Sequence, residues 1–342
     1  MLLQAATRPR EEKSKACLIL ADRKTLALRE IPLGRLPDLL KPHDLLVLND
    51  AATMPASLFG KTGEGAKVEL RLLSESEEGR WRAVAFGPGD WRQRTEDRVP
   101  PPILHPGDSL QFSPSLRGRV KEISPLSSRL LKIEFDPSGA DLWREFYAQG
   151  RPVQYSYLEE NLSLWHVQSA FSARPWAVEM PSAGAALPMG ILFRLREKGV
   201  RVASLTHACG LSASGDAVLD ASFPLGERYE IPEKTVRRVS ETLEGGGRVI
   251  AAGTSVMRAL EGNVLKYGGF LRAGEGRTEL LIAPGYTPKV VGGLLTGLHE
   301  MGESHFRLAA SLFPEEGLNR ILKKAEEAGM THHEFGDLCL IA

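Results

Sequence analysis

The stretch RVIAAGTSVMRALE, residues 248–261, decides how the fold of this chain is interpreted. Residues 249–252 form a short apolar run that is β-branched at its start and too brief for a helix, so a strand is expected. Gly253 interrupts the run, Thr254 and Ser255 can cap, and the next apolar residues have helical spacing. Such a strand–turn–helix exposes backbone N–H groups where open α/β sheets bind polar or anionic ligands. An ordinary capped βα turn has the same pattern, so both interpretations stay open.

Alternation of helix and strand patterns around this stretch predicts an α/β sheet. Expected helices cover residues 190–199, 232–247, 304–313 and 315–329, and expected strands cover 45–48, 200–207, 249–252, 278–286 and 336–342. Residues 16–20 and 25–31 are expected to form a hairpin around Asp22-Arg23-Lys24. Regular alternation of this kind indicates a mostly parallel sheet flanked by helices.

Between residues 65 and 137 the helical patterns give way to short alternating segments, which predicts an inserted barrel. VELRLL and RWRAVAF form a hairpin pattern around SESEEG, and SLQF, RGRVKEI and RLLKIEF follow as short alternating segments separated by Gly, Pro or Ser. Strands without intervening helices indicate a small antiparallel β-barrel. Because strand 45–48 precedes this region, we expect a discontinuous α/β domain, residues 1–64 and 138–342, with the barrel domain 65–137 inserted into it.

Composition excludes several classes of protein. Lys plus Arg equals Asp plus Glu at 43 each, so bulk attraction to a polyanion is not expected and any nucleic-acid contact needs a local patch. Cys17, Cys209 and Cys339 are widely spaced, which argues against a disulfide framework or a structural zinc. No apolar stretch approaches the ~20 residues of a membrane span, and residues 1–15 lack the apolar core of a secretory signal. We therefore expect a soluble cytoplasmic protein.

Several expected strands end at polar or small residues. In a parallel sheet these ends share one edge, the usual crevice for ligands. The candidates are Asn49, Asp50, Ser182, Gly184, Thr206, His207, Gly253, Thr254, Ser255, Gly285, Tyr286 and His299, and Arg258 lies one turn into the helix after Gly253. His207 and His299 are best suited to move protons near neutral pH. Turn, cap or core roles remain the alternative for each residue.

Two other features allow more than one interpretation. Cys209 lies two residues after His207, on the same face of a strand, but a nucleophilic pair needs an orienting group that the sequence does not locate, so a buried thiol is expected. The aromatic segment 155–176 could stack a ring or anchor a long loop. The chain has no GxGxxG with an acidic partner, Walker A, GxSxG or HExxH motif.

The order of motifs along the chain carries a resemblance to a known family. The motifs are HDLLVLNDAATMPASLFG (43–60), PSAG (181–184), SLTHACG (204–210), RVIAAGTSVMRALEG (248–262), APGY (283–286), TGLHEMGESHFRLAASLF (296–313) and EFGDLCLIA (334–342). Together they resemble the S-adenosylmethionine:tRNA ribosyltransferase-isomerase family of queuosine biosynthesis, over nearly the whole chain.

The resemblance implies an α/β domain with an inserted β-barrel and a defined reaction. The ribosyl part of S-adenosylmethionine would be transferred to the aminomethyl-deazaguanine base of tRNA, giving epoxyqueuosine and releasing adenine and methionine. S-adenosylmethionine would be a co-substrate, and no metal is implied. His207 and His299 would be the acid/base groups, and Arg258 would pair with a carboxylate or phosphate. The implied substrate-binding set is Asn49, Asp50, Ser182, Gly184, Thr206, Gly253, Thr254, Ser255, Gly285, Tyr286, Glu227 and Tyr229.

Departures from the family patterns keep two other hypotheses open. Ala52 and Ser57 replace both arginines of NDTRVIPARLFG, and neither can bind phosphate or carboxylate bidentately. Phe223 and Gly226 stand where the HxMHxExY pattern has histidines. The lost arginines favour a paralogue with a non-tRNA acceptor, and the lost histidines favour a catalytically silent S-adenosylmethionine-binding protein. The sequence predicts no oligomeric state.

Overall fold

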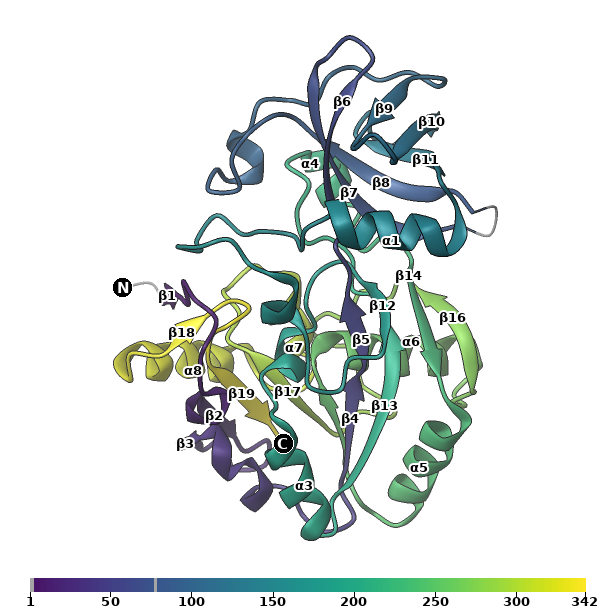
Figure 1. The fold of residues 1–342 in the computed structure, drawn as a ribbon. Coiled ribbons are helices and arrows are strands. Elements are labelled where there is room, and N and C mark those ends of the chain that lie inside the picture. Colours follow the sequence, from purple (N-terminus) through teal and green to yellow (C-terminus); the bar gives the residue numbers. More distant parts are fainter. Residues whose placement is uncertain (1–2, 77–78) are drawn as a thin grey trace.

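A mixed nine-stranded sheet forms the lower part of the molecule in Figure 1. The computed structural model describes residues 3–76 and 79–342. In spatial order the strands are β16 (Gly274–Thr278), β14 (Glu227–Ile231), β13 (Arg201–His207), β4 (Leu45–Asn49), β15 (Val249–Ala252), β17 (Gly293–Gly297), β19 (Leu338–Ile341), β2 (Cys17–Ala21) and β3 (Leu28–Pro32). Strands β13, β4, β15 and β17 are parallel, whereas the pairings β16–β14, β14–β13, β17–β19 and β2–β3 are antiparallel.

Helices cover both faces of this sheet because its central strands are apolar on both sides. In β4, Leu45 and Val47 join the core beneath α5 (Glu233–Glu244), α6 (Thr254–Lys266) and α8 (Glu315–Glu327). Leu46 and Leu48 point to the opposite face, where they meet α3 (Met189–Glu197). Continuous apolar runs of this kind are typical of parallel strands that are buried on both faces.

A closed six-stranded antiparallel barrel lies above the sheet (Figure 1). Its strands are β6 (Ser57–Thr62), β7 (Lys67–Glu75), β8 (Trp81–Phe86), β9 (Ser109–Gln111), β10 (Arg117–Ile123) and β11 (Leu130–Asp136). Helix α1 (Gly139–Gln149) packs against it, with the Phe146 ring 5.1 Å from the rings of Trp81 and Phe135. The barrel includes β6, which precedes residue 65, and the division into domains stays a prediction.

The remaining elements are short. The helices are α2 (Ser182–Ala185), α4 (Ala217–Asp220) and α7 (Ser304–Ala309), and the 3₁₀ turns are η1 (Lys13–Lys15), η2 (Leu33–Asp38), η3 (Thr95–Asp97) and η4 (Leu164–Val167). Two small parallel pairs join β1 (Gln4–Ala5) to β18 (Thr331–His332) and β12 (Arg174–Ala177) to β5 (Ala51–Thr53). No helix in the described part of the chain is long and apolar enough to cross a membrane.

The predicted α/β fold with an inserted barrel is confirmed, and one strand prediction is wrong. The hairpin of β2 and β3 and the strands β4, β13, β15 and β19 lie where the sequence predicts them. The predicted strand 278–286 is a loop instead: β16 ends at Thr278, and the next strand is β17. Strand β16 was not predicted because its sequence, GEGRT, is rich in glycine and polar residues. Gly276 is needed in this strand because a Cβ there would lie 2.4 Å from the Tyr229 hydroxyl. In the predicted SESEEG turn, residues 77 and 78 lie outside the described residues.

Candidate active site

Asn49 ties together the carboxyl ends of three strands. Its Oδ1 accepts a hydrogen bond from the His207 backbone N–H at 2.9 Å, and its Nδ2 donates to the His207 carbonyl at 3.0 Å. Nδ2 also lies 3.3 Å from the Ser255 Oγ, at the start of α6. Asn49 is fully buried. Its side-chain amide therefore supplies the hydrogen bonds to the His207 backbone at the point where the pairing of β4 with β13 ends. Three of the predicted strand-end residues, Asn49, His207 and Ser255, therefore lie together at one edge.

The Asp50 carboxylate accepts hydrogen bonds from hydroxyl groups of the neighbouring strand, β13. Its two carboxylate oxygens accept hydrogen bonds from Ser204 at 2.7 Å and from Thr206 at 2.6 Å. Asp50 and Thr206, both predicted to bind substrate, therefore lie together at the edge of the sheet but already satisfy each other.

His207, Glu227 and Arg258 form a buried group at this edge. The Nε2 atom of His207 lies 3.4 Å from the Oε2 atom of Glu227, and Nη1 of Arg258 donates to the same oxygen at 2.5 Å. The other oxygen of Glu227 accepts from the Gly210 backbone N–H at 2.8 Å. Arg258 also donates from Nε to the Leu280 carbonyl, at 3.1 Å. Its buried Nη2 and the Nε2 of His207 have no hydrogen-bond partner among the described residues.

Burial and neighbouring charges fix the ionisation of this group. Burial lowers the pKa of His207 to about 4, so its imidazole is neutral at physiological pH. Burial alone would raise the pKa of Glu227, but His207 and Arg258 outweigh it and hold the pKa below its usual value. Burial, reinforced by the Glu227 charge, raises the pKa of Cys209 to about 12. The Cys209 thiol therefore stays protonated, as expected for a buried thiol and not for a nucleophile.

The turn between β15 and α6 brings Gly253, Thr254 and Ser255 to the same edge. Gly253 has φ +104° and ψ 152°, a conformation that is essentially restricted to glycine. Ala183 of α2 lies next to this turn, 3.7 Å from where a Gly253 Cβ would be. Ser182 and Gly184 therefore lie near the predicted ligand turn, where Gly184 packs against the ring of Phe171.

His299 belongs to a second group that adjoins the first. Its Nε2 lies 2.8 Å from the Thr296 hydroxyl, and its Nδ1 lies 3.5 Å from Glu303. Its ring stacks on His305 with centroids 4.7 Å apart. Burial lowers the pKa of His305 to about 3, and the His299, Arg258 and Glu227 charges also act on it. The two predicted histidines thus lie in neighbouring polar groups.

Three of the predicted binding residues lie apart from these groups. Tyr229 is fully buried, and its hydroxyl accepts a hydrogen bond from Asn263 in α6. Glu227 and Tyr229 share a face of β14 because side chains alternate, but Tyr229 lies deeper, beneath α6. The Tyr286 hydroxyl donates to the buried Glu261, which also accepts from the backbone N–H groups of residues 289–291. The structure thus gives Tyr286, next to Gly285, a contact that anchors the loop.

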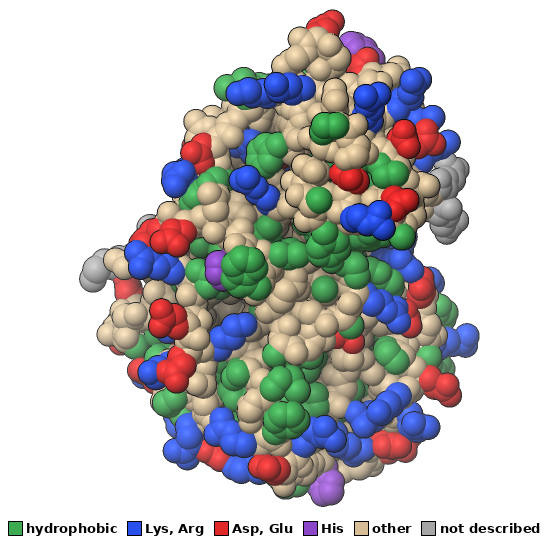
Figure 2. All heavy atoms as spheres, viewed as in Figure 1, with side chains coloured by type: hydrophobic (Ala, Val, Ile, Leu, Met, Phe, Trp, Pro, Cys, Tyr) green, Lys and Arg blue, Asp and Glu red, His purple; other side chains and the backbone are tan. Residues whose placement is uncertain are grey.

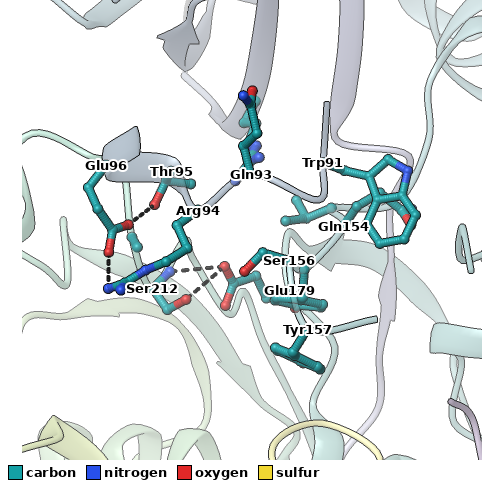
Figure 3. A pocket seen from close by; sticks show the side chains of 14 residues that line it. Trp91, Gln93, Arg94, Thr95, Glu96, Gln154, Ser156, Tyr157, Glu179 and Ser212 are labelled. Carbon is teal, nitrogen blue, oxygen red and sulfur yellow. Dashed lines mark hydrogen bonds and ion pairs between the residues drawn. The ribbon is translucent and has the colours of Figure 1, made fainter. Parts of the chain in front are cut away.

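A pocket lies where the barrel meets the sheet (Figure 3), and its volume is about 540 Å³ when the open solvent at its mouth is included. Its walls come from the barrel, from the segment after α1 and from the segments around Glu179 and Ser212. It adjoins the buried group because the Val178 backbone N–H donates to the Cys209 carbonyl at 2.7 Å. Tyr155 and Tyr157 in its wall are stacked with centroids 5.5 Å apart. The aromatic segment therefore supplies a flat surface here.

The sequence did not identify several residues around this pocket. Glu334 has a buried carboxylate oxygen without a partner among the described residues, and burial raises its pKa to about 7. The neighbouring His333 stacks on Tyr157 with centroids 4.4 Å apart, at a positive φ of 66°. Glu303 and His305 could have been found from their spacing after His299, whereas Glu179 and Glu334 carry no local signal. In the described part of the chain, no three His, Cys, Asp or Glu residues are arranged to hold a metal ion.

These features define an α/β protein with an inserted barrel and a buried His–Glu–Arg group at the carboxyl edge of its sheet. The chain belongs to the family described as queuosine biosynthesis protein, whose model matches residues 3–341. The S-adenosylmethionine:tRNA ribosyltransferase-isomerase of Trichlorobacter lovleyi is 32% identical over 343 residues, covering 97% of this chain and 94% of the relative. Its counterpart in Thermus thermophilus is also 32% identical, over 90% of this chain and 86% of its own length.

A solved structure supports the shared fold. The crystal structure of S-adenosylmethionine tRNA ribosyltransferase from Thermotoga maritima matches with a TM-score of 0.54. It is 23% identical in sequence and covers 99% of this chain and 96% of its own chain. At this identity the likeness concerns the fold, and the function is argued from the relatives and the site.

Proposed function

We propose that this chain transfers and isomerises the ribosyl moiety of S-adenosylmethionine onto the aminomethyl-deazaguanine base of tRNA, giving epoxyqueuosine in tRNA. The observation that carries this proposal is the 32% identity to S-adenosylmethionine:tRNA ribosyltransferase-isomerases over nearly the full length of both chains. Adenine and methionine are the leaving products. The proposed reaction uses S-adenosylmethionine as a co-substrate, needs no metal and takes place in the cytoplasm.

The buried group supports two complementary roles. A neutral imidazole at His207 can accept a proton, and its Nε2, 3.4 Å from the Glu227 carboxylate, has no hydrogen-bond partner among the described residues. The ionised carboxylate of Glu227 stabilises positive charge, which S-adenosylmethionine carries on its sulfur. Arg258 holds Glu227 in place and keeps it ionised. Of the two terminal nitrogens of Arg258, Nη1 donates to Glu227, so Nη2 is the one that could bind a substrate anion as predicted.

The second polar group supplies another candidate for proton transfer. The Thr296 hydroxyl and the Glu303 carboxylate orient the ring of His299, so each of its nitrogens has a defined neighbour. Asn49, Ser182, Gly184, Thr254 and Ser255 remain our candidates for positioning the substrate at the carboxyl edge. This assignment rests on their place around the turn before α6.

The acceptor would be bound without a general excess of positive charge. Figure 2 shows Lys and Arg side chains interspersed with Asp and Glu over both parts of the visible face. The formal net charge of zero agrees with this distribution. We therefore propose local contacts to the tRNA rather than a broad basic surface.

Adenine release is the experiment that tests this function. The protein is incubated with S-adenosylmethionine, with and without tRNA that carries the aminomethyl-deazaguanine base, and free adenine is quantified by chromatography. We expect release only with that tRNA, and loss of release in His207→Gln. The Lys132→Gln variant, on an exposed barrel strand, is the matched control and should retain activity. Absence of release from wild-type protein under both conditions would contradict the proposal.

One observation favours a second acceptor class. Ser57 stands where the family pattern has an arginine, and its buried hydroxyl donates to Glu69 at 2.8 Å instead of facing a substrate. A site that lacks this arginine could accept a smaller molecule that bears the same base. Adenine release that is independent of tRNA and is stimulated by the free aminomethyl-deazaguanine base would support that alternative.

A further inference from the structure

The pocket between barrel and sheet contains two groups of opposite charge with unused hydrogen-bonding capacity, of which Arg71 is buried and Glu179 is partly exposed. Four charged residues line it, and Arg94 and Glu96 form an ion pair with each other. The other two are Arg71, from barrel strand β7, and Glu179, which follows β12. No ion pair joins Arg71 to Glu179 among the described residues. The pocket thus presents a cationic and an anionic group that form no ion pair with each other, although the charge of Arg71 acts on Glu179.

Arg71 is a preorganised receptor for a carboxylate. Its Nε donates to Glu69 at 2.8 Å and its guanidinium lies 4.1 Å from the centroid of the Phe86 ring, so the side chain is fixed. Its two Nη atoms have no hydrogen-bond partner among the described residues. Glu69 is shared with Arg98 at 2.6 Å, so the three groups carry an excess of one positive charge. Arg71 is only 5% exposed, and a buried guanidinium with free donors favours an anionic partner.

Glu179 is the anionic group of the same pocket, and it has spare acceptor capacity. One of its oxygens accepts from the backbone N–H and the hydroxyl of Ser212, both at 3.0 Å, as the dashed lines in Figure 3 show. The second oxygen accepts no hydrogen bond from a described residue. Burial raises the pKa of Glu179, the hydrogen bonds from Ser212 and the charge of Arg71 offset part of this rise, and the charge of Glu227 adds to it. An incoming cation would relieve this cost.

We propose that Arg71 and Glu179 bind the amino-acid end of S-adenosylmethionine, Arg71 holding the α-carboxylate and Glu179 the α-ammonium group. This inference rests on the proposed function, since it places the co-substrate of that reaction. Tyr155 and Tyr157 line the same pocket, and an aromatic wall suits the positively charged sulfonium. The ribosyl moiety would then extend toward Glu227 and His207. A barrel arginine would thereby supply the carboxylate contact that Ala52 and Ser57 cannot make.

Ligand truncation tests this assignment without requiring turnover. Calorimetry measures the binding of S-adenosylmethionine, of its decarboxylated form and of 5′-methylthioadenosine, which lacks the amino-acid end, to wild type, Arg71→Gln and Glu179→Gln. We expect each variant to bind S-adenosylmethionine about ten- to one-hundred-fold more weakly, the range for losing a charge-assisted hydrogen bond. Methylthioadenosine should bind all three proteins equally. Decarboxylated S-adenosylmethionine should bind Arg71→Gln about as well as wild type.

Controls separate this inference from the proposed function. Arg119→Gln and Glu122→Gln change exposed barrel residues of the same types and should bind S-adenosylmethionine like wild type. If Arg71→Gln does not fold, as judged by circular dichroism, Glu179→Gln carries the test alone. Unchanged binding of S-adenosylmethionine by Glu179→Gln, or an undiminished preference of Arg71→Gln for the carboxylated ligand, would overturn the inference and leave the function standing. Wild-type protein that binds no S-adenosylmethionine would contradict both.

Discussion

Burial sets the charge of the individual residues at the carboxyl edge. His207 is fully enclosed and neutral at physiological pH, so the Glu227 carboxylate depends on Arg258 and on the Gly210 backbone N–H to offset the cost of its burial. Buried charges are costly unless they are paired, so these residues depend on one another. The same dependence makes single substitutions informative.

Removing the guanidinium of Arg258 should destabilise the protein and abolish activity. Arg258→Gln leaves the Glu227 carboxylate buried without its ion pair, and breaking a buried pair costs about 3–5 kcal/mol. Urea denaturation measures the free energy of unfolding. The control Lys132→Gln breaks an exposed pair with Glu122 and should cost less than ~1 kcal/mol. Equal, small effects of both variants would show that Glu227 does not depend on Arg258.

Glu334 should make stability depend on pH. Burial raises its pKa to about 7 from an ordinary value of 4.5, so the folded state keeps a proton that the unfolded state loses. The contribution of Glu334 to stability is therefore present below pH 4.5 and is lost as pH rises to about 7. Relative to wild type, Glu334→Gln should gain roughly 3 kcal/mol of unfolding free energy over this interval. A difference that does not vary with pH would contradict the assignment.

The sequence identified only some of these residues. His207, Arg258 and His299 could be predicted because they follow strands or begin a helix, where local patterns are strong. Arg71, Glu179 and Glu334 could not be predicted, since their burial and their partners depend on contacts between distant segments. Tyr229 packs in the core and the Tyr286 hydroxyl anchors a loop, and their role in substrate binding stays a prediction.

At the scale of elements, the turn between β15 and α6 is the decisive piece of local structure. The sequence predicted it from one glycine and two capping residues, and Gly253 has the backbone conformation that requires glycine. Residues 278–286 have an apolar run that predicts a strand, whereas residues 279–292 form a loop whose conformation is set by the buried Glu261. Apolar runs alone do not distinguish a strand from an anchored loop.

Gly253→Ala should test this turn. An alanine in this conformation costs about 1–3 kcal/mol and shifts the start of α6, so both the melting temperature and the rate of adenine release should fall. Gly190→Ala is the matched control, because Gly190 is in the first turn of α3 with open space around it. That variant should change stability by less than ~1 kcal/mol. A Gly253→Ala variant as stable and active as the control would contradict the assigned role.

At the scale of the whole molecule, the candidate site joins two architectures. The hydrophobic pattern of the sequence predicted both the sheet with its helices and the inserted barrel, because each has its own periodicity. It did not predict the pocket between them, since that pocket is formed by barrel residues, by the segment after α1 and by residues near Glu179. The proposed site thus depends on the insertion, which contributes Arg71.

Nucleoside analysis of the product is the most direct test of the central claim. tRNA bearing the aminomethyl-deazaguanine base is incubated with this protein and S-adenosylmethionine, digested to nucleosides and examined by mass spectrometry. We predict conversion of that nucleoside to epoxyqueuosine. Recovery of the unmodified nucleoside, from protein that demonstrably binds S-adenosylmethionine, would contradict the account.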